Sequence, residues 1–234
     1  MKNIIPFILI VFAFSCSEEK IEKAIEEITK PQFDTLTIGA KVYNMQDLAD
    51  SNFTFDDFDF TEDSDSLSIE KSKDVASRQG DTLFLKCDNG RIVKLKNINS
   101  DGDDMEYFSF TGLNKDINGY VVSRMRYEYY DVLIVNKYTG DSLFAIGYPV
   151  VSPNKKQFVC VNMDMEAGFT TNGIQLFKIE NAMYISAGLR ELNNWGPEKI
   201  MWKNDSTLIV KVVERTNEGI NRSYCKVLNI KSWR

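Results

Sequence analysis

The chain of 234 residues contains no histidine. Catalysis by a Ser-His-Asp or Cys-His arrangement needs an imidazole that accepts the proton of the nucleophile, so both arrangements are excluded. Zinc sites that use histidine are excluded as well, and the scattered cysteines do not form a four-thiolate site. The GxGxxG, GxxxxGK[S/T] and HExxH motifs are also missing. The sequence therefore predicts no cofactor, no metal site and no catalytic residue.

Long apolar runs are missing too. A helix that crosses a bilayer needs roughly 20 apolar residues, whereas the run at residues 4–14 is short and is broken by Pro6. It follows the positively charged Lys2, and small residues, Ala13 and Ser15, stand three places and one place before Cys16. This is the pattern of a secretory signal peptide. We therefore predict a signal peptide at residues 1–15 that is cut before Cys16.

The start of the chain resembles that of a bacterial lipoprotein, in which a cysteine directly follows the cleavage site. The resemblance rests on Ser15-Cys16 and on Ser-Glu-Glu at residues 17–19, which is similar to the acidic tag that directs lipoproteins of one Gram-negative phylum to the cell surface. It implies that Cys16 carries the lipid anchor and that the protein is surface-exposed at the outer membrane, with a periplasm-facing location as the alternative. Leucine is commoner in that family where Ala13 stands, so ordinary signal peptidase and a plain secreted protein form a second alternative.

The mature chain is acidic. The formal net charge is −6, and Lys2 is the one charged residue of the signal peptide, so −6 − 1 = −7 remains. Because such a surface offers no counter-charge, we expect no nucleic acid partner. Three cysteines lie in apolar runs and are interpreted as small core residues, with a Cys160–Cys225 disulfide as the alternative; they are Cys87, Cys160 and Cys225.

Helical patterns are confined to the first quarter of the chain. Residues 18–30, EEKIEKAIEEITK, place isoleucines at helical spacing, and Pro31 ends the pattern. We predict a lipidated tether at residues 16–32 that contains this short helix, followed by a single β-rich domain at residues 33–234. A further helix is predicted at residues 44–51.

Strand patterns fill the rest of the chain. TLFLKC and RIVKLKNI, with Asn89-Gly90 between them, predict a hairpin. Further apolar runs separated by turn residues continue to the end, which predicts a mainly β, antiparallel protein.

A weak repeat covers about residues 115–234. VSPNKKQFVCV from Val151 aligns with MWKNDSTLIVK from Met201, and QLFKI from Gln175 aligns with KVLNI from Lys226. The SPNKKQFVCV segment resembles the turn and strand of a propeller blade. We therefore predict a small or incomplete propeller-like assembly, with a β-sandwich as the alternative. The chain from Gly147 onward is also similar to uncharacterised exported bacterial proteins, which implies no activity.

Several short motifs have a structural and a functional interpretation. The S-x-x-K strings at residues 68–71 and 152–155 lie in strand-like surroundings and are interpreted as chance matches rather than a serine–lysine pair. The acidic, aromatic stretch at residues 53–66 predicts an exposed edge strand, or alternatively a calcium patch. Residues 97–102 and 114–119 match the first half of an EF-hand loop, but Phe108 and Met125 stand where its last ligand is needed. Turns are predicted there, with calcium loops as the alternative.

An Asp-Ser or Asp-Thr pair recurs before apolar residues. It resembles the O-glycosylation sequon of the same bacterial group, and it is also typical of a turn that enters a strand. Both interpretations apply to Asp34, Asp65, Asp81, Asp141 and Asp205.

Two classes of function remain. The first is a non-catalytic binding or structural lipoprotein whose strand-end loops contact an envelope protein or glycan. Aromatic residues near turns could supply the contact; they are Tyr127, Tyr129, Tyr130, Trp195 and Trp202. The alternative is a histidine-free hydrolase that cleaves envelope polysaccharide with a carboxylate pair, which would need two acids about 5 to 9 Å apart in a pocket.

Overall fold

A computed structural model describes residues 34–48, 53–55, 65–216 and 221–230. The chain divides into two compact units, Met1–Phe33 and Asp34–Arg234, and the description below concerns the second. The predicted signal peptide, Cys16 and the tether helix lie outside the described residues. Within the described part the protein is mainly β, with antiparallel sheets and one short helix, as the sequence predicts.

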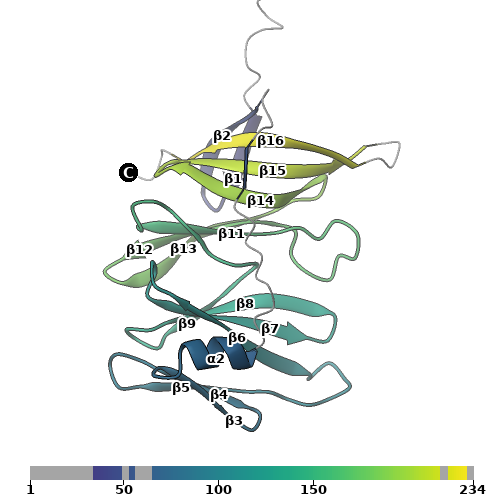
Figure 1. Ribbon diagram of the computed structural model, residues 1–234. Coiled ribbons are helices and arrows are strands. Elements are labelled where there is room, and N and C mark those ends of the chain that lie inside the picture. The colour runs from purple at the N-terminus through teal and green to yellow at the C-terminus, as the bar shows by residue number, and fades with distance from the viewer. Residues whose placement is uncertain (1–33, 49–52, 56–64, 217–220, 231–234) are drawn as a thin grey trace, which may run out of the picture. The chain divides into compact units, whose positions relative to one another are not determined.

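Four antiparallel sheets, here numbered I to IV, follow one another along the chain (Figure 1). Sheet I contains β3 (Ala76–Gln79), β4 (Thr82–Lys86) and β5 (Ile92–Lys96). Sheet II contains β6 (Glu106–Asn114), β7 (Gly119–Arg126), β8 (Tyr129–Asn136) and β9 (Ser142–Ala145). Sheet III contains β10 (Val150–Val151), β11 (Gln157–Asn162), β12 (Gly173–Glu180) and β13 (Met183–Glu191).

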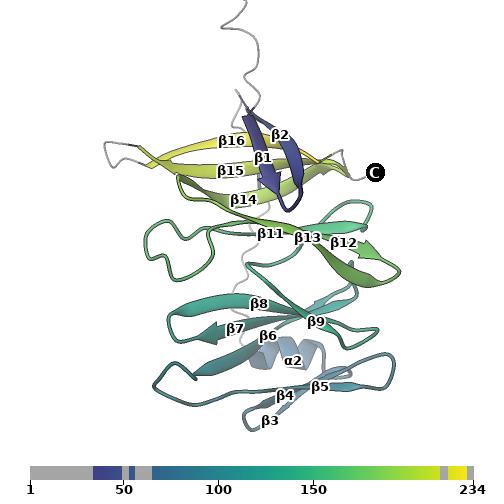
Figure 2. The ribbon, with the colours of Figure 1, turned by 180° about the vertical axis from the view of Figure 1, so that it is seen from behind.

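Sheet IV joins the two ends of the domain. Its strands, in spatial order, are β1 (Asp34–Ile38), β2 (Lys41–Asp47), β16 (Asn221–Asn229), β15 (Thr207–Arg215) and β14 (Trp195–Asn204). The N-terminal hairpin β1–β2 therefore completes a sheet whose other strands come from the C-terminal end, as both views of the ribbon show (Figures 1 and 2). A helix predicted at residues 44–51 is wrong for residues 44–47, because β2 pairs with β1 on one side and with β16 on the other.

Consecutive sheets share apolar cores. Ile69 of the helix α2 (Asp65–Lys71) packs with buried residues of sheets I and II, such as Leu85 and Phe110. Phe158 of sheet III stacks on Phe177 in the core that sheet III shares with sheet II. Sheets III and IV share a core as well. It contains Val159, Ile174 and Leu176 of sheet III and Leu208, Val210 and Leu228 of sheet IV. Each sheet thus buries apolar side chains against the next one, which follows from the alternation of apolar residues along its strands.

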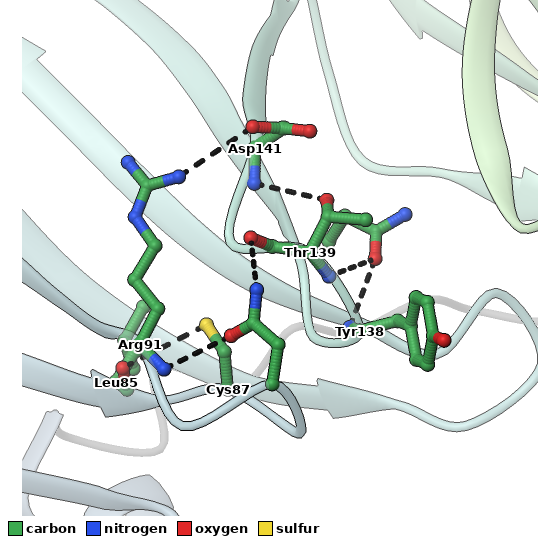
Figure 3. A network of polar contacts seen from close by, with 8 residues as sticks. Leu85, Cys87, Arg91, Tyr138, Thr139 and Asp141 are labelled. Carbon is green, nitrogen blue, oxygen red and sulfur yellow. Dashed lines mark hydrogen bonds and ion pairs between the residues drawn. The ribbon is translucent and has the colours of Figure 1, made fainter.

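Turns of neighbouring sheets also bond to one another. Asn89, in the β4–β5 turn, donates from Nδ2 to the carbonyl oxygen of Thr139 at 2.9 Å, and Arg91 pairs with Asp141 at 3.5 Å (Figure 3). The predicted Asn89-Gly90 hairpin is confirmed, with a φ of 84° at Gly90, a backbone angle that glycine adopts without strain. Between sheets III and IV, the backbone N–H of Asn154 donates to Asp205 at 2.9 Å. The turns of the predicted repeat therefore stack on each other.

The aligned segments of the repeat occupy corresponding strands. Residues 151–161 run from β10 into β11, and residues 201–211 run from β14 into β15. Residues 175–179 lie in β12 and residues 226–230 begin in β16, and each of these strands pairs with the strand before it. The next strand differs between the two sheets: β12 is followed by β13 in sheet III, whereas β16 is followed in sheet IV by β2, from the start of the domain.

All three cysteines of the domain are buried and free; they are Cys87, Cys160 and Cys225. The interpretation as core residues agrees with the structure, and the alternative Cys160–Cys225 disulfide is not formed. In the described part of the chain, no helix combines the length and the apolar character that crossing a membrane requires.

Candidate functional site

The connection between β11 and β12, residues 163–172, is a loop with a fixed internal structure, and we refer to it as the Phe169 loop. Asp164 organises it with both carboxylate oxygens. Oδ2 accepts hydrogen bonds from the backbone N–H of Thr170 at 2.7 Å and from its hydroxyl at 2.9 Å, and Oδ1 accepts from the N–H of Gly168 at 2.8 Å and of Ala167 at 3.1 Å. These bonds, led by the one from the Thr170 backbone, hold the pKa of Asp164 below its usual value.

Side-chain amides attach the Phe169 loop to the sheets. Asn162, at the end of β11, donates to the Thr170 hydroxyl and to the carbonyl oxygen of Thr171. Asn172 donates to the carbonyl oxygens of Leu192 and Trp195, which brings the loop against β14. The two ends of the loop are thereby fixed, and the hydrogen bonds to Asp164 fix its middle.

The loop presents two large apolar side chains to solvent, beside the exposed carboxylate of Glu166. The Phe169 side chain is 53% exposed and that of Met163 is 40% exposed, while Asp164 and Thr170 below them are partly covered. The loop crosses near Gly196, where an added Cβ would collide with Met163, so the absence of a side chain there makes room for it. An exposed aromatic ring on a pre-organised loop is typical of a protein-binding surface, because little conformational entropy is lost when a partner covers it.

A groove of about 430 Å³ lies on sheet IV. Phe53 and Phe55 line it together with residues of β14, β15 and β16, which are Lys199, Lys211, Ser223, Tyr224 and Cys225. Lys211 is paired with Glu198 at 2.9 Å. Burial raises the pKa of the Cys225 thiol, while the nearby Lys211 lowers it, and the net direction is upward. Cys225 is therefore protonated at neutral pH and is a poor nucleophile.

A second groove, of about 290 Å³, lies beside β10 and β14. Its lining is mostly apolar and includes Pro149, Val151 and Met201, with Asn114 from the end of β6 and Asp116 from the β6–β7 turn. Trp202 also lines it, but its indole N–H is used by the carbonyl oxygen of Val150 at 2.9 Å. Asp116 is paired with Lys155 at 2.7 Å.

Neither groove contains the carboxylate pair that a glycoside hydrolase needs. No acidic residue lines the groove on sheet IV, and Asp116 is the one acid that lines the second, as far as the described residues reach. Two acids do lie near each other on sheet II, Glu106 and Asp131, but Arg124 stands between them at 3.2 Å and 2.5 Å. Phe144 lies against the Arg124 guanidinium at 3.7 Å, so this cluster is a buried structural ion pair rather than an open pocket.

The calcium sites that the sequence left open as alternatives receive no support from the described residues. Groups of three or more metal-ligating side chains are absent from the described residues. Asn97 uses its side-chain oxygen to accept the N–H of Phe108, and Asn114 uses its own to accept the N–H of Asp116, so both Asn-rich loops are built as turns. Of the acidic stretch at residues 53–66, residues 56–64 lie outside the described part.

One S-x-x-K string was assigned to the wrong structure by its sequence context. Ser68 and Lys71 lie on α2, one turn apart, and not in a strand. The Ser68 side chain is buried and donates to the carbonyl oxygen of Thr111 at 3.2 Å, so its hydroxyl has a structural partner. Ser152 of the second string lies at a turn and bonds to Asn154 and Gln157. The structure offers no serine–lysine pair at either string within the described residues.

The Asp-Ser and Asp-Thr pairs mostly precede strands, as turn chemistry predicts. Asp34, Asp81, Asp141 and Asp205 stand at or just before β1, β4, β9 and β15. Asp65 is different, because it begins α2, pairs with Arg78 at 2.6 Å and accepts the N–H of Phe110. O-glycosylation at these positions stays a prediction.

The aromatic residues that the sequence singled out divide into two groups. Tyr127 is 50% exposed at the β7–β8 turn, whereas the other four are more covered and lie against their sheets: Tyr129, Tyr130, Trp195 and Trp202. Sequence reasoning missed Phe169. The signal available was the spacing of Asp164 before Gly168 and Thr170, because an aspartate that precedes such residues often organises a loop.

Comparison with known proteins adds no further assignment: no protein-family profile matches the chain, and no curated protein matches it significantly.

Proposed function

We propose that this protein is a lipid-anchored, non-catalytic binding protein of the bacterial cell envelope. The proposed anchor is Cys16, made the first residue of the mature chain by cleavage after Ser15. The small residues before Cys16, the short apolar run and the acidic residues after it support this proposal. A surface-exposed location at the outer membrane is part of the proposal.

The Phe169 loop is the proposed contact with an envelope partner, and its pre-organised, exposed aromatic tip is the observation that carries the proposal. A flexible loop would lose conformational entropy on binding, but Asp164 already holds this one through four hydrogen bonds. Aromatic residues that become fully covered dominate the energy of many interfaces. We therefore propose an envelope protein as the partner of Phe169 and Met163.

The hydrolase alternative is disfavoured by the grooves. Hydrolysis by a carboxylate pair requires two acids that face one space, and the linings of both grooves lack such a pair among the described residues. The acids that do lie together, Glu106 and Asp131, are bound to Arg124.

For the fold, we propose a small, incomplete propeller-like arrangement in which each sheet is one blade-like unit. The order of strands supports it, because sheets I to III are each formed from consecutive strands. The completion of sheet IV by β2 also supports it, since joining the two ends of the chain in one blade is a way to hold a repeat array together. A β-sandwich remains the alternative.

The test of the binding proposal is recovery of the partner from cross-linked cells. The wild-type protein is compared with Phe169→Ala and with Tyr138→Ala, a matched control that removes a similarly exposed aromatic from the β8–β9 turn of sheet II. We expect the partner to be lost with Phe169→Ala, with affinity about 30-fold weaker for the isolated pair, because truncating a central aromatic costs about 2 kcal/mol. Equal recovery with both variants would refute the role of the loop, and turnover of a glycan panel by the wild type would favour the hydrolase.

The anchor is tested separately by mass spectrometry of the mature N-terminal peptide. We expect an acylated Cys16 with no residue before it. A peptide that begins at another residue, or a Cys16 without acyl mass, would contradict the anchor without bearing on the Phe169 loop.

A further inference from the structure

The solvent-facing side of sheet I carries a cluster of positive charge. Side chains alternate along a strand, and one side of sheet I, with Leu83 and Leu85, is buried against sheet II. The opposite side, here named the sheet I face, therefore consists of the alternate positions on β3, β4 and β5. These are Ser77, Gln79, Thr82, Phe84, Lys86, Ile92, Lys94 and Lys96.

The three lysines of this face are exposed and have no carboxylate partner among the described residues. Lys86, Lys94 and Lys96 make no ion pair with any residue that the structure describes, in contrast to Lys137 and Lys211. Lys94 and Lys96 are two residues apart on β5, which separates their Cα atoms by about 7 Å. Lys86 lies on the adjacent strand, opposite Ile92.

Carboxylates are absent from the sheet I face and occur in the turns beside it. Asp88, two residues after the end of β4, is already bound to Lys137. Asp81 lies in the turn before β4. The chain as a whole has six more acids than bases, so a face with three lysines and no acid is a local inversion of its charge.

The sheet I face also carries apolar residues, so a need for solubility does not by itself explain its composition. A terminal sheet needs a polar outer side to stay in water, but that requirement does not call for Ile92, which is 52% exposed. Phe84 lies beside it in the middle of the face, half-buried, paired with Ser77 on one side and with Lys94 on the other. The Lys94 ammonium lies 5.7 Å from the centre of the Phe84 ring. An aromatic ring bordered by cations is thus the centre of the surface.

We propose that the sheet I face binds an anionic polysaccharide. The lysines would pair with its carboxylate, sulfate or phosphate groups, and the ring of Phe84 would lie against the apolar face of a sugar. Ser77, Gln79 and Thr82 form an uncharged polar border on the same face, and their hydroxyl and amide groups can bond to sugar hydroxyls.

Polysaccharide fits this face better than two other polyanions. Single-stranded nucleic acids bind to platforms of several aromatic rings, on which successive bases stack, whereas this face has one ring. An anionic membrane is bound by basic residues together with several apolar side chains that enter the lipid, and Ile92 is the one strongly exposed apolar residue here. The surface is separate from the Phe169 loop, so the proposal does not depend on the one made above.

The test measures binding of the full-length protein to polygalacturonate, with neutral dextran as the reference polymer. The variant Lys86→Gln/Lys94→Gln/Lys96→Gln is compared with Lys115→Gln/Lys156→Gln/Lys203→Gln, which removes the same charge from exposed positions of other sheets. We expect the first variant to bind at least tenfold more weakly, with a smaller dependence on salt, and the second to bind within about twofold of the wild type. Thermal melting establishes that both variants are folded.

A second variant tests the sugar contact. Phe84→Leu keeps the charge of the face, so we expect weaker binding to polygalacturonate and unchanged binding to polyglutamate, which has carboxylates but no sugar. Equal weakening by both lysine variants would overturn the proposal, and so would no weakening by either. Binding to single-stranded DNA or to vesicles of anionic phospholipid that exceeds binding to polygalacturonate would also overturn it.

Discussion

Two glycines face each other where the N-terminal hairpin meets sheet III, and the consequences of filling the space between them can be calculated. Gly39 forms the β1–β2 turn with a φ of +60°, and Gly188 lies in β13 with a φ of +140°. A Cβ at Gly39 would overlap the carbonyl oxygen of Ala187, and a Cβ at Gly188 would overlap the backbone of Gly39. Because the obstacles are backbone atoms, no side chain can rotate to relieve the contact.

The substitution Gly39→Ala therefore carries two costs. The left-handed conformation costs an alanine roughly 1–2 kcal/mol, partly offset by the smaller entropy of the unfolded chain, about 0.4–1 kcal/mol. The backbone collision adds about 1–3 kcal/mol, the usual cost of overpacking. Gly80→Ala is the matched control, because Gly80 has a φ of +54° and a Cβ there would have no neighbour within 4 Å.

Urea unfolding of the two variants isolates the contact. We expect Gly39→Ala to lower the free energy of unfolding by about 1–3 kcal/mol more than Gly80→Ala does. For a domain of this size that difference corresponds to roughly 2–4 °C in Tm for each kcal/mol. Equal destabilisation by the two substitutions would refute the close approach of the β1–β2 turn to β13. Gly188→Ala should reproduce the larger effect, since it fills the same space from the other side.

Three further outcomes are expected from the described contacts. Because its pKa is lowered in the folded state, Asp164 should stabilise the Phe169 loop fully at neutral pH and lose that effect as pH falls through its folded pKa. The protection of the Gly168 and Thr170 amides, measured relative to the unprotected exchange rate at each pH, should fall over that range and should already be low at neutral pH in Asp164→Asn. Arg124→Leu should lower the free energy of unfolding by about 3–5 kcal/mol, because it leaves the buried Asp131 without its cationic partner. Adding Asp131→Val should restore part of this loss in urea unfolding, and simple additivity of the two changes would contradict the pairing. The thiols should resist iodoacetamide in the native protein and react after unfolding, which peptide mass spectrometry would detect for Cys87, Cys160 and Cys225.

Local patterns predicted the parts of the fold that depend on local pairing. The Asn89-Gly90 turn fixes the register of β4 and β5 because its backbone geometry joins two adjacent strands. The apolar surroundings of Cys160 predicted burial, and the residue is fully buried. In such cases the residues that determine the structure are neighbours in the chain.

The errors concern contacts between distant residues. β2, residues 41–47, has a two-residue alternation in which Tyr43 and Met45 are buried, but the run is too short to be distinguished from a helix end. What makes it a strand is pairing with β16, about 180 residues later. Similarly, Asp65 begins α2 and bonds to Arg78 and Phe110, partners that no local rule connects to it.

The sequence predicted the type of the candidate site, an aromatic surface near turns, but not the residue that forms it. The composition indicates aromatic residues near turns, but only the exposed fraction of each side chain in the folded protein shows which ring can contact a partner. Trp202 donates its N–H to Val150 and packs against the core, while Phe169 is 53% exposed on a loop that Asp164 holds in place. The sheet I face was hidden for another reason, because an overall negative charge gives no information about where the lysines gather.

The pairing of β2 with β16 also fixes an order of events during synthesis. β1 and β2 leave the ribosome first, yet the strand beside them is among the last to be made. The emerging hairpin therefore has no partner until almost all of the chain has been synthesised, and contacts of such high sequence separation form slowly. Until then the edges of β2 and β15 are both open to pairing with another chain. A premature stop within β16 would consequently leave unpaired edges at both ends of the chain, so truncated products are expected to associate with one another rather than to persist as shorter folded proteins.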